Sequence, residues 1–286
     1  MVNVTFFGVR GSTPCPSPAN ARYGGNTACV VVDRPGAERD TEHGSQPIIL
    51  DIGTGLRAYG ETVPADVDFR GSAFVTHLHW DHVQGLPFFL PTLRPGGVLD
   101  VYGPPPEPGT SLGEAFAAFM RPPYFPVTIA DLKGDISFHD FAAGTVSIGD
   151  ATITAAPVPH VGVTNGYRLD WAGVSVAYVS DHQQPDDQSF EVDQGVLDLC
   201  RDVDLLIHDA QYTADEFAAK CDWGHCTVDY AVQVANQCGA RRLALFHHDP
   251  MHDDGWLDCL LGAARTLAAP DLEVISAYEG LTIALS

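Results

Sequence analysis

Six consecutive residues of this chain hold four side chains that can bind a metal ion. His77, His79, Asp81 and His82 follow the run Ser72–Val75, which is typical of a buried strand. Alternate residues of a strand point to one face, so we expect His77 and His79 to point the same way. Asp81 and His82 would then lie on the turn into a helix. The segment predicts a site for two adjacent metal ions, which hydrolases of this kind hold about 3.5–4 Å apart.

Three later strand-like runs also end in a candidate ligand. Those residues are His160, Asp181 and one of the pair His247 and His248. Functional side chains of sheet proteins gather on the loops at strand ends, so we expect these residues to meet the first four. Neighbouring residues of a strand point to opposite faces, so only one of the pair can face the ions, and we favour His247.

The pattern His77-x-His79-x-Asp81-His82 resembles the HxHxDH signature of the metallo-β-lactamase fold superfamily, and the later order His, Asp, His matches as well. The resemblance covers nearly the whole chain. It implies two divalent metal ions, the first bound by His77, His79 and His160, the second by Asp81, His82 and His247, with Asp181 as the bridge. Imidazole and carboxylate ligands suit zinc, our first expectation, and also manganese or iron.

Three more residues resemble supporting groups of this superfamily. Asp51 would orient a ligating histidine, with capping of the next turn as the alternative. Asp209 and His225 resemble the acidic and histidine motifs of the ribonuclease Z branch, although that branch usually has glutamate at the first position. On this resemblance Asp209 would orient His225, and His225 would contact the phosphate or protonate the leaving alkoxide. Arg10, in a Gly-rich loop, could meet a phosphate or simply lie in a turn.

The elements that must position these residues are mainly strands, with helical patterns between groups of strands. Apolar residues at helical spacing predict helices at Ser111–Met120, Thr227–Cys238 and Asp253–Ala268. Two mixed sheets packed face to face with helices outside would bury such strands on both faces. The resemblance implies the same α/β fold, a four-layer αββα sandwich. We find no linker, so residues 1–286 are predicted to form a single domain. The Pro-rich segment 103–126 forms either a wall near the site or a surface excursion.

Composition restricts the substrate and the compartment. The chain has 37 acidic and 15 basic residues, a net charge of −22, which repels long polyanions. Between Leu93 and Pro159 we find no Gly-rich basic arm of the kind with which ribonuclease Z grips transfer RNA. The sequence has no run of 18 apolar residues, so we expect no membrane-spanning helix. The N-terminus lacks secretory features, and seven scattered cysteines suit free thiols in the cytoplasm.

These observations favour a dimetal phosphodiesterase that hydrolyses a cyclic nucleotide or another small phosphodiester. A hydroxide bridging the metals would attack the phosphorus, Asp81 would support the metal pair, and His225 would protonate the leaving group. Three alternatives stay open. They are an RNA-processing nuclease of the ribonuclease Z type, a hydrolase of lactones, thioesters or lactams, and a metal-binding sensor or cofactor-pathway protein with little turnover. Analogy with the superfamily also predicts a homodimer.

Overall fold

The computed structural model describes residues 1–35, 46–186 and 189–286. His43 and most of the polar loop expected at residues 34–47 lie outside these residues. The described chain forms two seven-stranded sheets. The first has the order β14 (Thr282–Leu285), β1 (Val2–Gly8), β2 (Cys29–Asp33), β3 (Ile48–Leu50), β4 (Arg70–Phe74), β5 (Val98–Gly103), β6 (Asp135–Asp140). The second has the order β13 (Glu273–Ser276), β12 (Arg242–Phe246), β11 (Leu205–Asp209), β10 (Val174–Val179), β9 (Asn165–Trp171), β8 (Ala151–Pro157), β7 (Gly144–Ile148).

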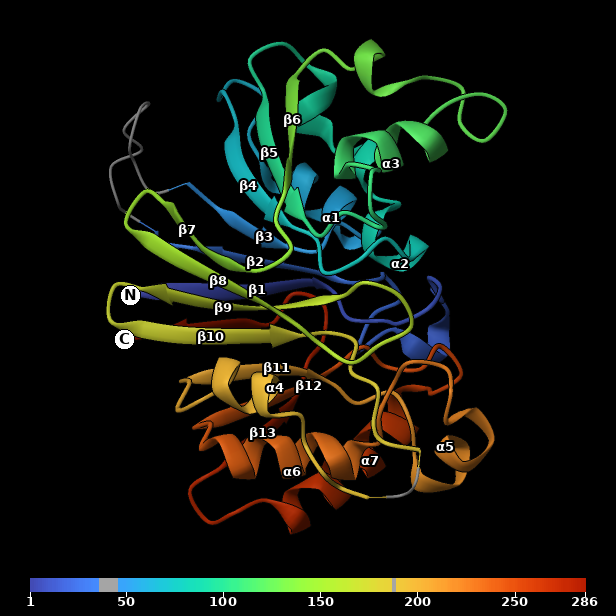
Figure 1. Cartoon of the computed structure of the whole chain (residues 1–286), viewed down its shortest axis with the longest axis vertical. Helices are drawn as coiled ribbons and strands as arrows, with labels where there is room; N and C mark the ends of the chain where they lie inside the picture. Colours follow the sequence, from blue (N-terminus) through green and yellow to red (C-terminus); the bar gives the residue numbers. More distant parts are fainter. Residues whose placement is uncertain (36–45, 187–188) are drawn as a thin grey trace.

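Helices cover the outer faces of both sheets. They are α1 (Gly55–Thr62), α2 (Trp80–Val83), α3 (Leu112–Phe119), α4 (Gln194–Leu199), α5 (Ala214–Lys220), α6 (Val228–Cys238) and α7 (Asp254–Leu267). Short 3-10 turns lie at Pro18–Asn20, Leu86–Phe88, Leu90–Leu93 and Ile129–Asp131. Helices α1 and α3 contact the first sheet, and α4, α6 and α7 contact the second (Figure 1). The predicted αββα sandwich is therefore confirmed.

Three apolar clusters hold the layers together. The central one lies between the sheets, where Phe6, Tyr178 and Phe246 are fully buried. The ring of Phe246 lies 6.1 Å from that of Phe6 and 5.6 Å from that of Tyr178. The other two clusters pack the helices on the outer sheet faces. Central strands such as β2, β3, β10 and β11 are buried along almost their whole length, because they are covered on both faces.

Parallel strands at the middle of both sheets bring the loops of the site together. Strands β3, β4 and β5 run parallel in the first sheet, and β10, β11 and β12 run parallel in the second. Functional groups collect beyond the carboxyl ends of such strands. The chain segments that follow β3, β4, β8, β10, β11 and β12 all contribute to the candidate site.

Local sequence explains the ends of helix α6. The hydroxyl of Thr227 accepts a hydrogen bond from the amide of Tyr230 at 3.1 Å, which caps the first turn. Gly239 ends the helix in the left-handed conformation at φ +72°, which favours glycine. This helix is the one predicted at Thr227–Cys238.

The structure corrects the expected position of the first histidines. Strand β4 ends at Phe74, so His77 and His79 lie on a loop rather than on a strand, and helix α2 begins at Trp80. The reason is that the amide of Thr76 donates to the carboxylate of Asp51 at 2.8 Å instead of to a neighbouring strand. Strand β6 and helices α1, α4 and α5 were not predicted.

The Pro-rich segment 103–126 is partly helical. Its helix α3 buries Leu112 and Phe116 in the outer core of the first sheet, whereas Tyr124 is exposed. The stretch from Leu93 to Pro159 consists of β5, α3, the 3-10 turn Ile129–Asp131, β6, β7, β8 and their connections. All seven cysteines are free thiols. Among the described helices, none has the length and apolar character needed to cross a membrane.

We expect Phe246→Ala to lower the free energy of unfolding by about 3–5 kcal/mol, because it leaves a cavity between the two sheets. Chemical denaturation measures this loss. Leu267→Ala is the control, since Leu267 is 47% exposed at the end of α7. Equal stability of the two variants would contradict the packing described above.

Candidate metal centre

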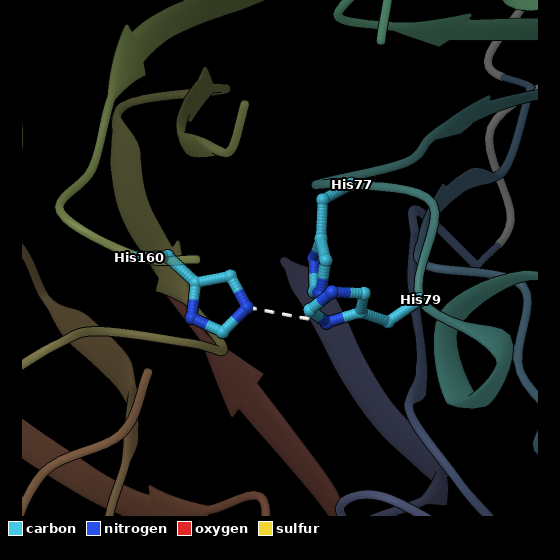
Figure 2. Close-up of side chains that lie close together, drawn as sticks. All are labelled: His77, His79 and His160. Carbon is cyan, nitrogen blue, oxygen red and sulfur yellow. Dashed lines mark hydrogen bonds between the residues drawn. The ribbon is translucent and has the colours of Figure 1, made fainter. Parts of the chain in front are cut away.

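The first group of candidate ligands joins two loops that are far apart in the sequence. His77 and His79 lie on the loop after β4, and His160 reaches them from the loop after β8 (Figure 2). One potential ligand atom from each of the three lies within 4.8 Å of the others. The Nε2 atom of His160 lies 3.2 Å from Nδ1 of His79, and Nδ1 of His160 donates to the carbonyl of Gly224 at 2.6 Å. The structure therefore brings these three imidazoles together as expected.

The second group consists of Asp81, His82 and His247, again with ligand atoms within 4.8 Å. The Oδ2 atom of Asp81 lies 3.2 Å from Nε2 of His82 and 3.1 Å from Nε2 of His247. His247 follows β12 with φ +56°, which changes the chain direction. His248 points away, with its Nε2 atom 2.9 Å from the carbonyl of Ala277. The backbone thus selects His247 over its neighbour.

Asp181, after β10, lies between the two groups. Its Oδ1 atom is 3.2 Å from Nε2 of His82 and 3.5 Å from Nε2 of His247. Its Oδ2 atom is 3.8 Å from Nε2 of both His77 and His160. Each oxygen therefore faces a different group, which is the geometry that a bridging carboxylate needs.

The hydrogen bonds of His82 and His247 leave two nitrogen lone pairs facing each other. Nδ1 of His82 lies 2.7 Å from Asp51, and Nδ1 of His247 lies 2.8 Å from the amide oxygen of Gln211. We assign the ring protons to these Nδ1 atoms because both partners are acceptors. The Nε2 atoms, 3.2 Å apart, then both present lone pairs. Two neutral rings would repel each other in this arrangement, so a cation, either a further ring proton or a metal ion, is needed close to both Nε2 atoms.

Two other buried atoms also point to cations. Nε2 of His77 and Oδ1 of Asp181 have no hydrogen-bond partner within the described parts of the chain. An unsatisfied buried polar atom is costly, and a metal ion would satisfy both of these. The residues present therefore fit the divalent ions that this fold implies, with imidazole and carboxylate ligands that zinc accepts.

Burial and charge set different protonation states within the cluster. Burial lowers the pKa of His77, His79 and His160, which keeps these imidazoles in the neutral form that binds metals. Burial also opposes the charge on His82, but the neighbouring carboxylates, that of Asp181 foremost, raise its pKa well above the usual value. Without a metal ion, His82 therefore retains a proton, and a bound cation would replace that proton.

Asp51 is a buried carboxylate that fixes the positions of residues around the cluster. Its carboxylate is fully buried and accepts hydrogen bonds from the amide of Thr76 at 2.8 Å, the hydroxyl of Tyr178 at 2.9 Å and Nδ1 of His82 at 2.7 Å. This arrangement matches the expected orienting contact to a histidine of the cluster rather than the alternative role in a turn.

Asp209 and His225 are paired, as predicted. Nδ1 of His225 lies 3.0 Å from Oδ2 of Asp209, and Asp209 also accepts from the amides of His182 and Gln211 at 3.0 Å each. Aspartate is therefore long enough to make this contact. The ring of His225 stacks on that of His247 at 5.0 Å, directly beside the metal cluster.

Several positioning groups had no recognisable sequence signal. The amide of Ser12 donates to Oδ2 of Asp81 at 2.6 Å, and Gln211 binds Nδ1 of His247. A Cβ atom on Gly11 would lie 2.5 Å from the ring of His247, so glycine is needed for the close approach of this loop. These contacts come from loops that only the folded chain brings together.

Arg10 has a structural role in the loop that carries it. Its guanidinium is fully buried and donates to the carbonyls of Gly24 at 2.8 Å, Asp249 at 3.1 Å and His252 at 2.7 Å. The side chain therefore holds backbone segments together and does not line the cavity, which favours the expected role in a turn over the alternative contact with a phosphate.

A cavity of about 470 Å³ opens over the cluster. It is lined by Ser12, Leu78, His79, Trp80, Asp81, Asp181 and His225. Its size falls within the range of about 300–1,000 Å³ that is common for small-ligand sites.

Comparison with known proteins agrees with this geometry. A sequence profile described as a Beta-lactamase superfamily domain matches residues 48–248. The chain belongs to the β-lactamase superfamily. Ribonuclease Z of Haloarcula marismortui is 26% identical, over 98% of this chain and 96% of the relative. The resemblance noted from the HxHxDH motif is thereby confirmed, and the chain is a metal-dependent hydrolase of this superfamily.

Solved structures share the fold. The metallo-beta-lactamase fold protein YhfI from Bacillus subtilis superposes with a TM-score of 0.71 at 20% identity, covering 99% of this chain and 98% of the other. A diphosphatase from the PhnP family superposes with a TM-score of 0.69 at 16% identity, covering 100% of this chain and 98% of the other. At these identities the likeness establishes the architecture of this β-lactamase superfamily member and not its substrate.

We expect the native protein to bind two metal ions and Asp81→Ala to bind one and to lose nearly all turnover, because Asp81 contacts both His82 and His247. Metal analysis of the purified protein measures the stoichiometry. The exposed Asp66→Ala is the matched control and should keep both ions. Two ions in Asp81→Ala would contradict the ligand assignment.

Proposed function

We propose that this protein is a phosphodiesterase that uses two divalent metal ions, zinc in the first instance, to hydrolyse a cyclic nucleotide or another small phosphodiester. His77, His79 and His160 would hold one ion, and Asp81, His82 and His247 would hold the other, with Asp181 between them. When bound, such ions polarise the phosphoryl oxygens and lower the pKa of water.

The observation that carries the phosphodiester proposal is the pair of Asp209 and His225 beside the cluster. The ring of His225 lies 5.0 Å from that of His247 and 5.5 Å from that of His160. With Nδ1 directed to Asp209, its Nε2 atom is the one left to meet a ligand. A histidine held by a carboxylate can carry a proton to an alkoxide, and alkoxides of phosphodiesters need one.

In the proposed reaction, water replaces the leaving oxygen on phosphorus and His225 supplies a proton. The oxygen of a water molecule forms a bond to phosphorus as the bond from phosphorus to the leaving oxygen breaks, and the proton that the water loses returns to Nε2 of His225 at the end of the turnover. His225 donates its Nε2 proton to that leaving oxygen, and the contact of its Nδ1 atom with the Asp209 carboxylate keeps the ring in position. The amide of Ser12 and the side chain of Gln211 keep Asp81 and His247 in place throughout.

Charge supports a small substrate. No lysine or arginine is among the residues that line the cavity, and the whole chain carries a net charge of −22. Binding of long nucleic acids relies on many contacts between basic side chains and phosphates. One phosphate beside two metal ions needs no such surface.

Cleavage of precursor transfer RNA is the second candidate, because the relative from Haloarcula marismortui is a ribonuclease Z. The metal-loaded protein should be assayed with a cyclic nucleotide, bis(4-nitrophenyl) phosphate, a precursor transfer RNA, a lactone and a thioester. We expect turnover of the two small diesters. Preference for the RNA would favour the second candidate, and turnover of the lactone or thioester alone would refute both.

We expect His225→Ala to retain two metal ions and to lower the rate of the chemical step by roughly 10²–10⁴-fold, the usual contribution of a positioned acid. Metal analysis and single-turnover measurements with a diester that has a poor leaving group test this. The loss should shrink for bis(4-nitrophenyl) phosphate, because nitrophenolate leaves without a proton. Loss of a metal ion would instead make His225 a ligand.

A further inference from the structure

Trp80 stands at the entrance of the metal cavity, with its side chain unusually exposed. It is the first residue of α2, and 78% of it is accessible to solvent. The next two residues of the same helical turn, Asp81 and His82, are buried in the cluster. The backbone of Trp80 is therefore held on both sides, by His79 and by Asp81, while its indole points outward.

The cavity offers few ways to hold the part of a substrate that is not phosphate. Its titratable lining groups are the carboxylates of Asp81 and Asp181 and the imidazoles of His79 and His225, and none of the described residues that line it is a lysine or an arginine. Leu78 and Trp80 are the apolar residues of the lining. Trp80 has no stacking or cation-π partner among the described residues, so the faces of its indole remain open to a ligand.

Resting on the proposed phosphodiesterase activity, we infer that Trp80 is the platform on which an aromatic base of the substrate stacks, so that the substrate class is a nucleoside phosphodiester. A base has a flat π face that stacks on tryptophan whatever its hydrogen-bonding pattern. This contact adds no positive charge, which suits a cavity whose cations would be the metal ions alone. The phosphate would lie over the cluster while the base extends over Trp80 at the cavity edge.

Two ligands that differ only in the base separate this contact from phosphate binding. Adenosine 5′-monophosphate and ribose 5-phosphate share the sugar and the phosphate group. Calorimetric titration of the metal-loaded protein should show about 5- to 150-fold tighter binding of the nucleotide, the range of one stacked base. Trp80→Ala should abolish this preference without weakening ribose 5-phosphate, and Trp80→Phe should keep part of it.

Trp223→Ala is the matched control. Trp223 is also exposed, at 60%, but it does not line the cavity, so this variant should retain the full preference. Metal analysis of each variant shows whether the cluster is intact. Equal affinity of the native protein for both ligands, or an unchanged preference in Trp80→Ala, would overturn the inference.

The same titrations separate this inference from the proposed function. Hydrolysis of diesters without any base preference would refute the role of Trp80 and leave the phosphodiesterase standing. A preference for the nucleotide that depends on Trp80, in a protein that hydrolyses no diester, would refute the phosphodiesterase and retain the base site.

Discussion

The carboxylate of Asp181 lies between two groups of imidazole nitrogens, and the geometry of the whole site depends on this position. Its two oxygens face different groups, at 3.2 Å from His82 on one side and 3.8 Å from His77 on the other. A buried carboxylate among buried rings is unfavourable unless opposite charge is close. Divalent cations, which the fold implies, would supply that opposite charge, so stability and chemistry would depend on the same contact.

Rigidity around the cluster comes from hydrogen bonds that fix each ring. Asp51 fixes His82, Gln211 fixes His247, and the carbonyl of Gly224 fixes His160. In each case the partner takes one ring nitrogen and leaves the other free to face the centre. Such partners set the tautomer and the direction of a metal ligand, and their loss usually costs 10- to 100-fold in metal affinity or activity, roughly.

Charge and shape divide the work of recognition. The strongly acidic surface disfavours long polyanions, while a local cationic centre can still hold one phosphate. An apolar rim with Trp80 then supplies the contact that electrostatics cannot. This division accounts for the small phosphodiester proposed as the substrate of this chain, whereas the relative from Haloarcula marismortui is a ribonuclease Z.

The sequence by itself determined the layered fold and named the seven residues of the cluster, because strand patterns and the ends of strands are local features. It also indicated the pair of Asp209 and His225. Only the tertiary structure shows why His247, the favoured residue of the pair, faces the cluster and His248 does not, since this depends on the left-handed backbone at His247. The supporting contacts of Gln211 could not be predicted from the sequence either, because they join loops that become neighbours only when the two sheets pack together.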